Sequence, residues 1–150
     1  VVDQKTGRLN RHQLAMRSFA TPTAVKKLEA IEMPYIIRTL KETLVEVSLK
    51  EDAPAVCVVE VPLLDRIESL LMLADEVVAV VSPYELRKKR AQLRGVSLKD
   101  FEQRVAGQPS DEYLRSKAAT VIDNSKDEDL LATYVNAWWD ALMTKLDMRH

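Results

Sequence analysis

The chain has 150 residues, enough for one domain with a core of ordinary size. Its 22 basic and 23 acidic residues give a net charge of −1, which argues against a general attraction to nucleic acid or to an anionic membrane. A single cysteine excludes an internal disulfide and suits a cytoplasmic protein, and no segment is apolar for long enough to predict a membrane span.

The N-terminal third of the sequence predicts helices. Asn10 suits the N-cap of a helix over residues 11–19, because its side chain can accept a hydrogen bond from a free backbone N–H of the first turn. Apolar residues then recur at helical spacing. Pro34 falls among them and cannot donate a backbone hydrogen bond, so it is expected to divide them into two helices, near 23–32 and 34–48.

An apolar run, AVCVVEVPLL, follows these helices. It predicts a strand over Ala55–Val61 that is buried on both faces at the centre of a parallel sheet, with Cys57 as a buried structural thiol. Ligands of such sheets bind beyond the carboxyl ends of the strands. Glu60 at that end suits a magnesium-bound water or a substrate hydroxyl, but equally a helix cap or a lysine partner. The residues expected at the edge of the site are Glu60, Pro62, Leu63 and Leu64.

The rest of the chain alternates strands with helices, as in an α/β fold with a parallel sheet. Glu76–Val81 is expected to be a second interior strand, with Ala119–Ile122 alongside it. Ser82 is expected to cap the helix that follows the first of these strands. The expected helices cover residues 65–73, 84–94, 98–106, 110–118 and 127–147.

Glycines and metal-binding residues are scarce. Gly7, Gly95 and Gly107 are too far apart for the motifs G-x-x-x-x-G-K-[ST] and G-x-G-x-x-G, so these 150 residues contain no phosphate-binding loop of either kind. Two histidines and one cysteine do not make a convincing metal cluster. The sequence therefore predicts no protein-bound metal.

Basic residues concentrate on the helix expected after the second strand. A helix of such charge in a nearly neutral protein can be a solvent-exposed face. Its place directly after the carboxyl end of a strand is also that of helices that bring arginines over polyphosphate, where catalysis depends on positioning and charge neutralisation. Both interpretations stay open. The residues are Arg87, Lys88, Lys89, Arg90 and Arg94, followed on later helices by Arg104 and Lys117.

Five segments in collinear order resemble the motifs of one family. GRLNRHQLAMRSF is similar to G-x-L-x-R-x-x-L-x-x-x-x-F, with Arg11 on its arginine, and LEAIEMPYI is similar to L-E-x-I-x-H-P-x-I. VVEVPLL resembles the strand end D-[IV]-P-L-L. ELRKKRAQLRGVS with QRVAGQ resembles a lid pattern, R-x-x-x-R followed by R-x-x-x-Q, and AATVIDNS resembles A-D-x-V-I-D-N-S. Together they resemble the dephospho-coenzyme A kinases, which phosphorylate the ribose 3′-hydroxyl with ATP in the last step of coenzyme A synthesis.

The resemblance implies a P-loop-kinase-like, three-layer α/β fold of the nucleoside-monophosphate-kinase type. Here it would have a parallel sheet that lacks the N-terminal P-loop strand, and a helical lid. Residues 1–150 would form one domain. Its parts would be a helical acceptor or coenzyme A-binding region over about 8–48, a core over 55–82 and 119–147, and a lid over about 84–118.

The resemblance also implies roles for individual residues and a set of substrates. Arg90 would be catalytic. Nucleotide binding would involve Arg94, Arg104, Gln108 and Asn124, and acceptor binding would involve Arg11, Glu60, Pro62, Leu63 and Leu64. The substrates would be dephospho-coenzyme A and ATP with Mg²⁺, and no role for nucleic acid or a membrane is implied.

Several departures from the family's motifs leave two functions open. The Walker A loop and the acidic motif that supplies the family's proposed base are absent from these residues and are expected upstream of Val1. The chain would then be the acceptor side and lid of a kinase, inactive alone. The alternative is a noncatalytic module that binds nucleotide or coenzyme A. The substituted positions are Met33 for histidine, Glu60 and Ala119 for aspartate, and Arg66 for an acid.

Overall fold

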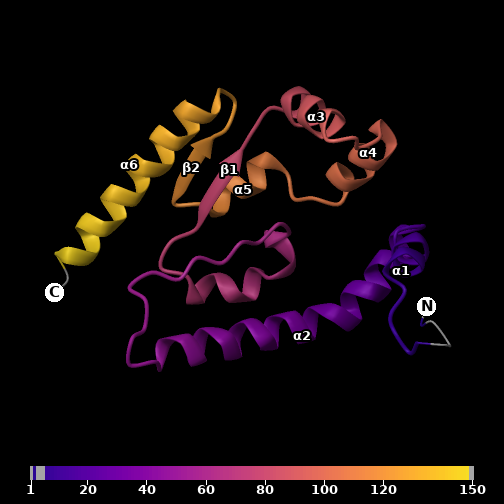
Figure 1. Cartoon of the computed structure of the whole chain (residues 1–150), viewed down its shortest axis with the longest axis horizontal. Coiled ribbons are helices and arrows are strands. Elements are labelled where there is room, and N and C mark those ends of the chain that lie inside the picture. The colour runs from indigo at the N-terminus through magenta and orange to yellow at the C-terminus, as the bar shows by residue number, and fades with distance from the viewer. Residues whose placement is uncertain (1, 3–5, 149–150) are drawn as a thin grey trace. The chain divides into compact units, whose positions relative to one another are not determined.

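The computed structural model describes Val2 and residues 6–148. The chain forms two compact units, Val1–Glu60 and Val61–His150 (Figure 1). Helices combine with a small parallel sheet, which confirms the expected α/β class. The assignment of the whole chain to a single domain stays a prediction. Within the described residues, no helix is long and apolar enough to cross a membrane.

The first unit consists mainly of two helices that contact each other, α1 (Arg11–Ser18) and α2 (Pro22–Ser48). Asn10 caps α1, because its side-chain oxygen accepts a hydrogen bond of 3.0 Å from the backbone N–H of Gln13. This confirms the predicted start of the first helix. Thr21 caps α2 in the same way, through the N–H of Ala24 at 3.2 Å.

The predicted break at Pro34 is wrong. Helix α2 continues through this proline and runs over 27 residues (Figure 1). A proline inside a helix removes one backbone hydrogen bond and costs about 3 kcal/mol. The turns on both sides of it keep their own hydrogen bonds, so the helix tolerates the interruption.

The predicted central strand, Ala55–Val61, is also wrong. Residues 56–61 have no regular secondary structure, Cys57 is exposed rather than buried, and Val58 is 73% exposed. A strand needs a neighbour for its backbone hydrogen bonds, and within the described residues no segment pairs with this one. The segment therefore has the apolar composition of a buried strand, but it does not form a strand in this structure.

The sheet of the second unit joins β1 (Val78–Val81) to β2 (Thr120–Asp123). The two strands are parallel, with Val78 opposite Thr120 and Val81 opposite Asp123. This confirms a strand within the second predicted range and its predicted neighbour. The described sheet has only these two strands, so β1 is not the interior strand that the sequence predicted. Ala79, Val81 and Ile122 are buried, since α5 contacts β1 and α6 contacts β2 (Figure 1).

The helix expected over 65–73 is instead a pair of 3₁₀ helices, η1 (Leu64–Arg66) and η2 (Glu68–Leu73). Leu64, Ile67 and Leu70 are buried. Their spacing of three residues matches the period of a 3₁₀ helix, so one side of the segment can face the core from Leu64 to Leu70.

The other helices lie close to their predicted ranges. Ser97 caps α4 and Ser110 caps α5 through hydrogen bonds of 3.1 Å to backbone N–H groups. The predicted cap at Ser82 is wrong, because Pro83 is the N-cap of α3 and no side-chain hydrogen bond caps this helix. The helices are α3 (Tyr84–Leu93), α4 (Leu98–Ala106), α5 (Asp111–Lys117) and α6 (Glu128–Asp147).

Glu76 connects the sheet of the second unit to its last helix. Its Oε1 atom accepts hydrogen bonds from Thr120 Oγ1 at 2.6 Å and from Trp138 Nε1 at 3.0 Å. These two hydrogen bonds favour the charged carboxylate and lower the pKa of Glu76 from its ordinary value of 4.5.

Replacement of Glu76 tests this connection. Glu76→Ala is expected to lower the free energy of unfolding by about 1–2 kcal/mol near neutral pH, because both donors lose their acceptor. The native pKa is lowered, so this contribution is present above pH 4.5 and is lost as the pH falls through the native pKa. Urea unfolding at several pH values, followed by tryptophan fluorescence, measures it. Equal unfolding free energies for Glu76→Ala and the exposed control Glu102→Ala would contradict this role.

Candidate functional site

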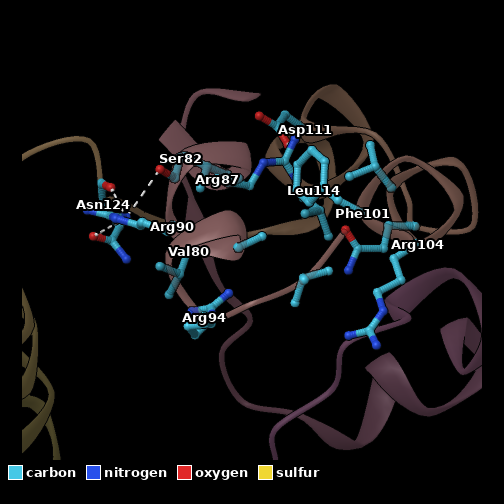
Figure 2. Close-up of a pocket in the computed structure, with 15 residues that line it drawn as sticks. Val80, Ser82, Arg87, Arg90, Arg94, Phe101, Arg104, Asp111, Leu114 and Asn124 are labelled. Carbon is cyan, nitrogen blue, oxygen red and sulfur yellow. Dashed lines mark hydrogen bonds and ion pairs between the residues drawn. The ribbon is translucent and has the colours of Figure 1, made fainter. Parts of the chain in front are cut away.

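A cavity of about 390 Å³ lies in the second unit (Figure 2). The end of β1, helices α3, α4 and α5, and the loop after β2 all contribute to its lining. Its charged side chains are four arginines and one aspartate, and three further polar side chains accompany them. They are Arg87, Arg90, Arg94, Arg104 and Asp111, with Ser82, Gln108 and Asn124.

The five residues for which the sequence predicted catalytic or nucleotide-binding roles all line this cavity. They come from α3 and its C-cap, α4, the segment after α4, and the loop after β2, so the fold brings together residues that are far apart in the sequence. Their individual roles stay predictions. The residues are Arg90, Arg94, Arg104, Gln108 and Asn124.

Arg90 connects α3 to the loop after β2 (Figure 2). Its Nη1 atom donates to the backbone carbonyl of Asn124 at 2.9 Å and to Asn124 Oδ1 at 3.1 Å. The same atom lies 3.5 Å from Ser82 Oγ, and Nη2 donates to the Lys126 carbonyl at 3.1 Å. In this conformation the guanidinium holds Asn124 at the edge of the cavity.

Arg94 and Arg104 are the most available cations of the cavity. Both side chains are exposed, and neither has a hydrogen bond or ion pair with any residue that the structure describes. A guanidinium presents several N–H donors in one plane and can bind two oxygens of a phosphate at once. These two arginines can therefore take an anionic ligand without losing a protein partner.

Arg87 and Asp111 form an ion pair of 3.7 Å between α3 and α5. On the apolar side, Phe101 of α4 is buried, and its ring centroid lies 5.4 Å from that of Tyr84 on α3. These contacts hold the three helices around the cavity. No pattern in the sequence predicts this ion pair, because its partners lie on helices that are not adjacent along the chain.

The predicted acceptor residues lie outside the cavity's lining. Arg11 and Glu60 are exposed residues of the first unit. In the second unit, Pro62 is exposed, Leu63 is half-buried at the start of η1, and Leu64 is buried. Their acceptor role stays a prediction. In the part of the chain that is described, no three His, Cys, Asp or Glu side chains gather where a metal ion could bind.

Comparisons with known proteins point to one family. A family model described as dephospho-CoA kinase matches residues 1–129. A dephospho-CoA kinase of Corynebacterium diphtheriae is 33% identical over 142 residues, which cover 94% of this chain and 70% of the relative. One of Corynebacterium jeikeium is 38% identical over 137 residues, which cover 91% of this chain and 69% of the relative. One of Thermobifida fusca is 32% identical over 144 residues, which cover 95% and 70%.

Proposed function

The chain belongs to the dephospho-CoA kinase family, and from this premise we propose that its arginine-lined cavity binds the phosphates of ATP. The reaction is transfer of the γ-phosphoryl group to the ribose 3′-hydroxyl of dephospho-coenzyme A, in coenzyme A biosynthesis. The observation that carries the proposal is the convergence of Arg87, Arg90, Arg94 and Arg104 on one cavity. Four guanidinium groups beside one carboxylate favour a polyanion.

The residues of the cavity divide between two parts of the nucleotide. Arg94 and Arg104 bind phosphate oxygens, because their donors are not engaged by the described part of the protein. Asn124 lies near the adenine, on a loop that Arg90 holds in place. Gln108, which also lines the cavity, contributes an amide. ATP enters as its Mg²⁺ complex, with the metal as part of the substrate.

Charge stabilisation is the main catalytic contribution that these residues can make. The transferred phosphoryl group carries its charge on three equatorial oxygens in the transition state, and preorganised cations lower the barrier there. Arg90 approaches this group and is the catalytic residue of the proposal. The residues proposed for acceptor binding are Arg11, Glu60, Pro62, Leu63 and Leu64.

A noncatalytic module that binds nucleotide or coenzyme A is the second candidate. It is favoured by the sequence, whose glycines Gly7, Gly95 and Gly107 cannot form a Walker A loop. Both candidates predict that ATP binds in the cavity. Only the kinase predicts phosphoryl transfer once such a loop is supplied.

Measurement of ATP binding to the chain tests the prediction that both candidate functions share, namely that ATP binds in the cavity. Arg94→Gln and Arg104→Gln are each expected to weaken ATP affinity about 10- to 150-fold, since a hydrogen bond to a charged group contributes about 1.5–3 kcal/mol. Isothermal titration calorimetry measures this, and the affinity should also fall with added salt. Arg115→Gln, an exposed arginine on α5 outside the lining, is the matched control. Equal losses in all three variants would contradict a specific site.

A further inference from the structure

The segment formed by η1 and η2 is fixed to the second unit by its apolar side. Leu64, Ile67 and Leu70 are buried. The polar residues between them are only partly buried or exposed, and they contact the helices that line the cavity. The buried apolar side chains therefore fix this segment, so that its polar side chains can hold neighbouring helices in place.

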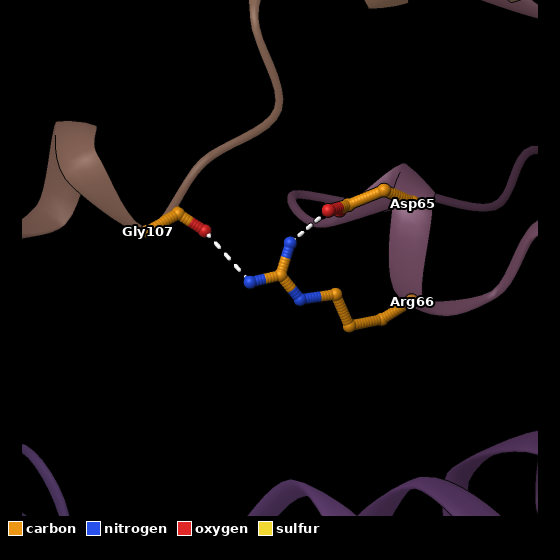
Figure 3. Close-up of polar contacts among 3 residues, drawn as sticks. All are labelled: Asp65, Arg66 and Gly107. Carbon is orange, nitrogen blue, oxygen red and sulfur yellow. Dashed lines mark hydrogen bonds and ion pairs between the residues drawn. The ribbon is translucent and has the colours of Figure 1, made fainter. Parts of the chain in front are cut away.

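Arg66 reaches from this segment to the end of α4 (Figure 3). Its Nη2 atom donates to the backbone carbonyl of Gly107 at 3.1 Å, and its Nη1 atom forms an ion pair with Asp65 Oδ2. Gly107 is the C-cap of α4, so no N–H of a further helical turn is available for its carbonyl. A cation at a helix C-terminus also interacts favourably with the helix dipole.

Glu68 makes a second connection from the same segment, to α5. It forms an ion pair with Lys117, which lowers the pKa of Glu68 and raises that of Lys117. Arg66 and Glu68 thus hold the two ends of the stretch from Gly107 to Lys117. Gln108, which lines the cavity, directly follows the first of these two points.

We propose that Arg66 is a positioning residue for the nucleotide cavity. By holding the carbonyl of Gly107, it fixes the end of α4 so that Arg104 and Gln108 point their side chains at the ligand. The inference rests on the proposed binding of ATP in this cavity. Arg66 does not line the cavity itself, so its effect on the ligand passes through α4.

The first test needs no ligand. The N–H groups of Gly107 and Gln108 donate to the carbonyls of Arg104 and Val105, both at 3.1 Å. In Arg66→Gln these two amides are expected to exchange with solvent several-fold faster than in the unchanged chain, because the end of α4 loses its anchor. Arg66→Lys keeps a donor and should restore part of the protection. Unchanged exchange in Arg66→Gln would overturn the inference, whether or not ATP binds.

The second test is a double-mutant cycle on ATP affinity. Arg66→Gln is expected to weaken ATP binding about tenfold in the unchanged chain and clearly less when Arg104 is already replaced by glutamine. The reason is that Arg66 acts on ATP by positioning Arg104, so its loss matters less once that side chain is gone. Arg115→Gln serves as the control and should be additive with Arg104→Gln. Full additivity of Arg66→Gln with Arg104→Gln would overturn the positioning role. Absence of ATP binding by the unchanged chain would instead contradict the proposed function, and the exchange experiment would still decide on Arg66.

Discussion

Incubated with ATP, Mg²⁺ and dephospho-coenzyme A, the 150-residue chain by itself is expected to show no turnover above the uncatalysed background. In phosphoryl transfer the β- and γ-phosphates must be held by a ring of backbone N–H groups and a lysine. Gly7, Gly95 and Gly107 cannot build that ring, because each is isolated in the sequence. The arginines alone do not hold the substrates in the reacting geometry. The reaction then loses the lowering of the activation barrier that proximity supplies, roughly 7–11 kcal/mol when fully realised.

The comparison is a chain extended at Val1 by the strand and Walker A loop of a family relative. Production of ADP and of coenzyme A is measured for both chains under the same conditions. The extended chain is expected to turn over, whereas the shorter one is not. Similar rates for the two chains would contradict the need for the loop, and inactivity of both would favour the noncatalytic module.

Arg90→Gln in the extended chain is expected to lower kcat about 10²–10³-fold, the usual loss when one preorganised donor to a transition state is removed. The carbonyls of Asn124 and Lys126 also lose their donors, so a fall of about 1–3 kcal/mol in the free energy of unfolding should accompany the loss of rate. Steady-state kinetics and urea unfolding on the same preparations separate the two effects.

Two further variants define the role of Arg90. Lys89→Gln, an exposed change on the same helix and outside the cavity lining, should leave kcat near its original value. Arg90→Lys keeps the charge but has one nitrogen in place of the two Nη atoms that donate here, so it should restore stability only in part. If Arg90→Gln loses stability without any change in kcat, Arg90 supports the loop after β2 and is not catalytic.

Most helices of this fold and several of their caps were predictable from sequence because their signals are local. Asn10, Ser97 and Asp127 each accept a backbone N–H three residues ahead, so four residues suffice to identify the start of a helix. The strands β1 and β2 were also predicted, since each is a short apolar run next to turn residues and each finds the other as its neighbour.

The strand predicted over Ala55–Val61 failed because strand formation is not a local property. The apolar run records a preference for burial, but a strand also requires a second segment at hydrogen-bonding distance, and the sequence of the run does not specify one. The helix break predicted at Pro34 failed because a local signal was too weak. The free-energy cost of a proline inside a helix was outweighed by the rest of the long helix α2.

At the cavity, the sequence and its resemblance predicted which residues would gather, but not how they are connected. Arg90 was expected above the phosphates, and its contacts with Asn124 and Lys126 had no sequence signal. The same holds for Arg66 and Gly107, which are 41 residues apart. Such contacts depend on where rigid elements place the ends of long side chains, and no short motif encodes that geometry.

The central claim is that the arginine cavity binds the phosphates of ATP, and the side-chain Nε–Hε signals of the arginines test it most directly. In a nuclear magnetic resonance titration of the chain with MgATP, the signals of Arg94 and Arg104 are expected to shift together and to saturate. Those of the exposed Arg38 and Arg115 should stay in place. Shifts of equal size at all four arginines, or no shift at Arg94 and Arg104 while ATP binds, would contradict the account.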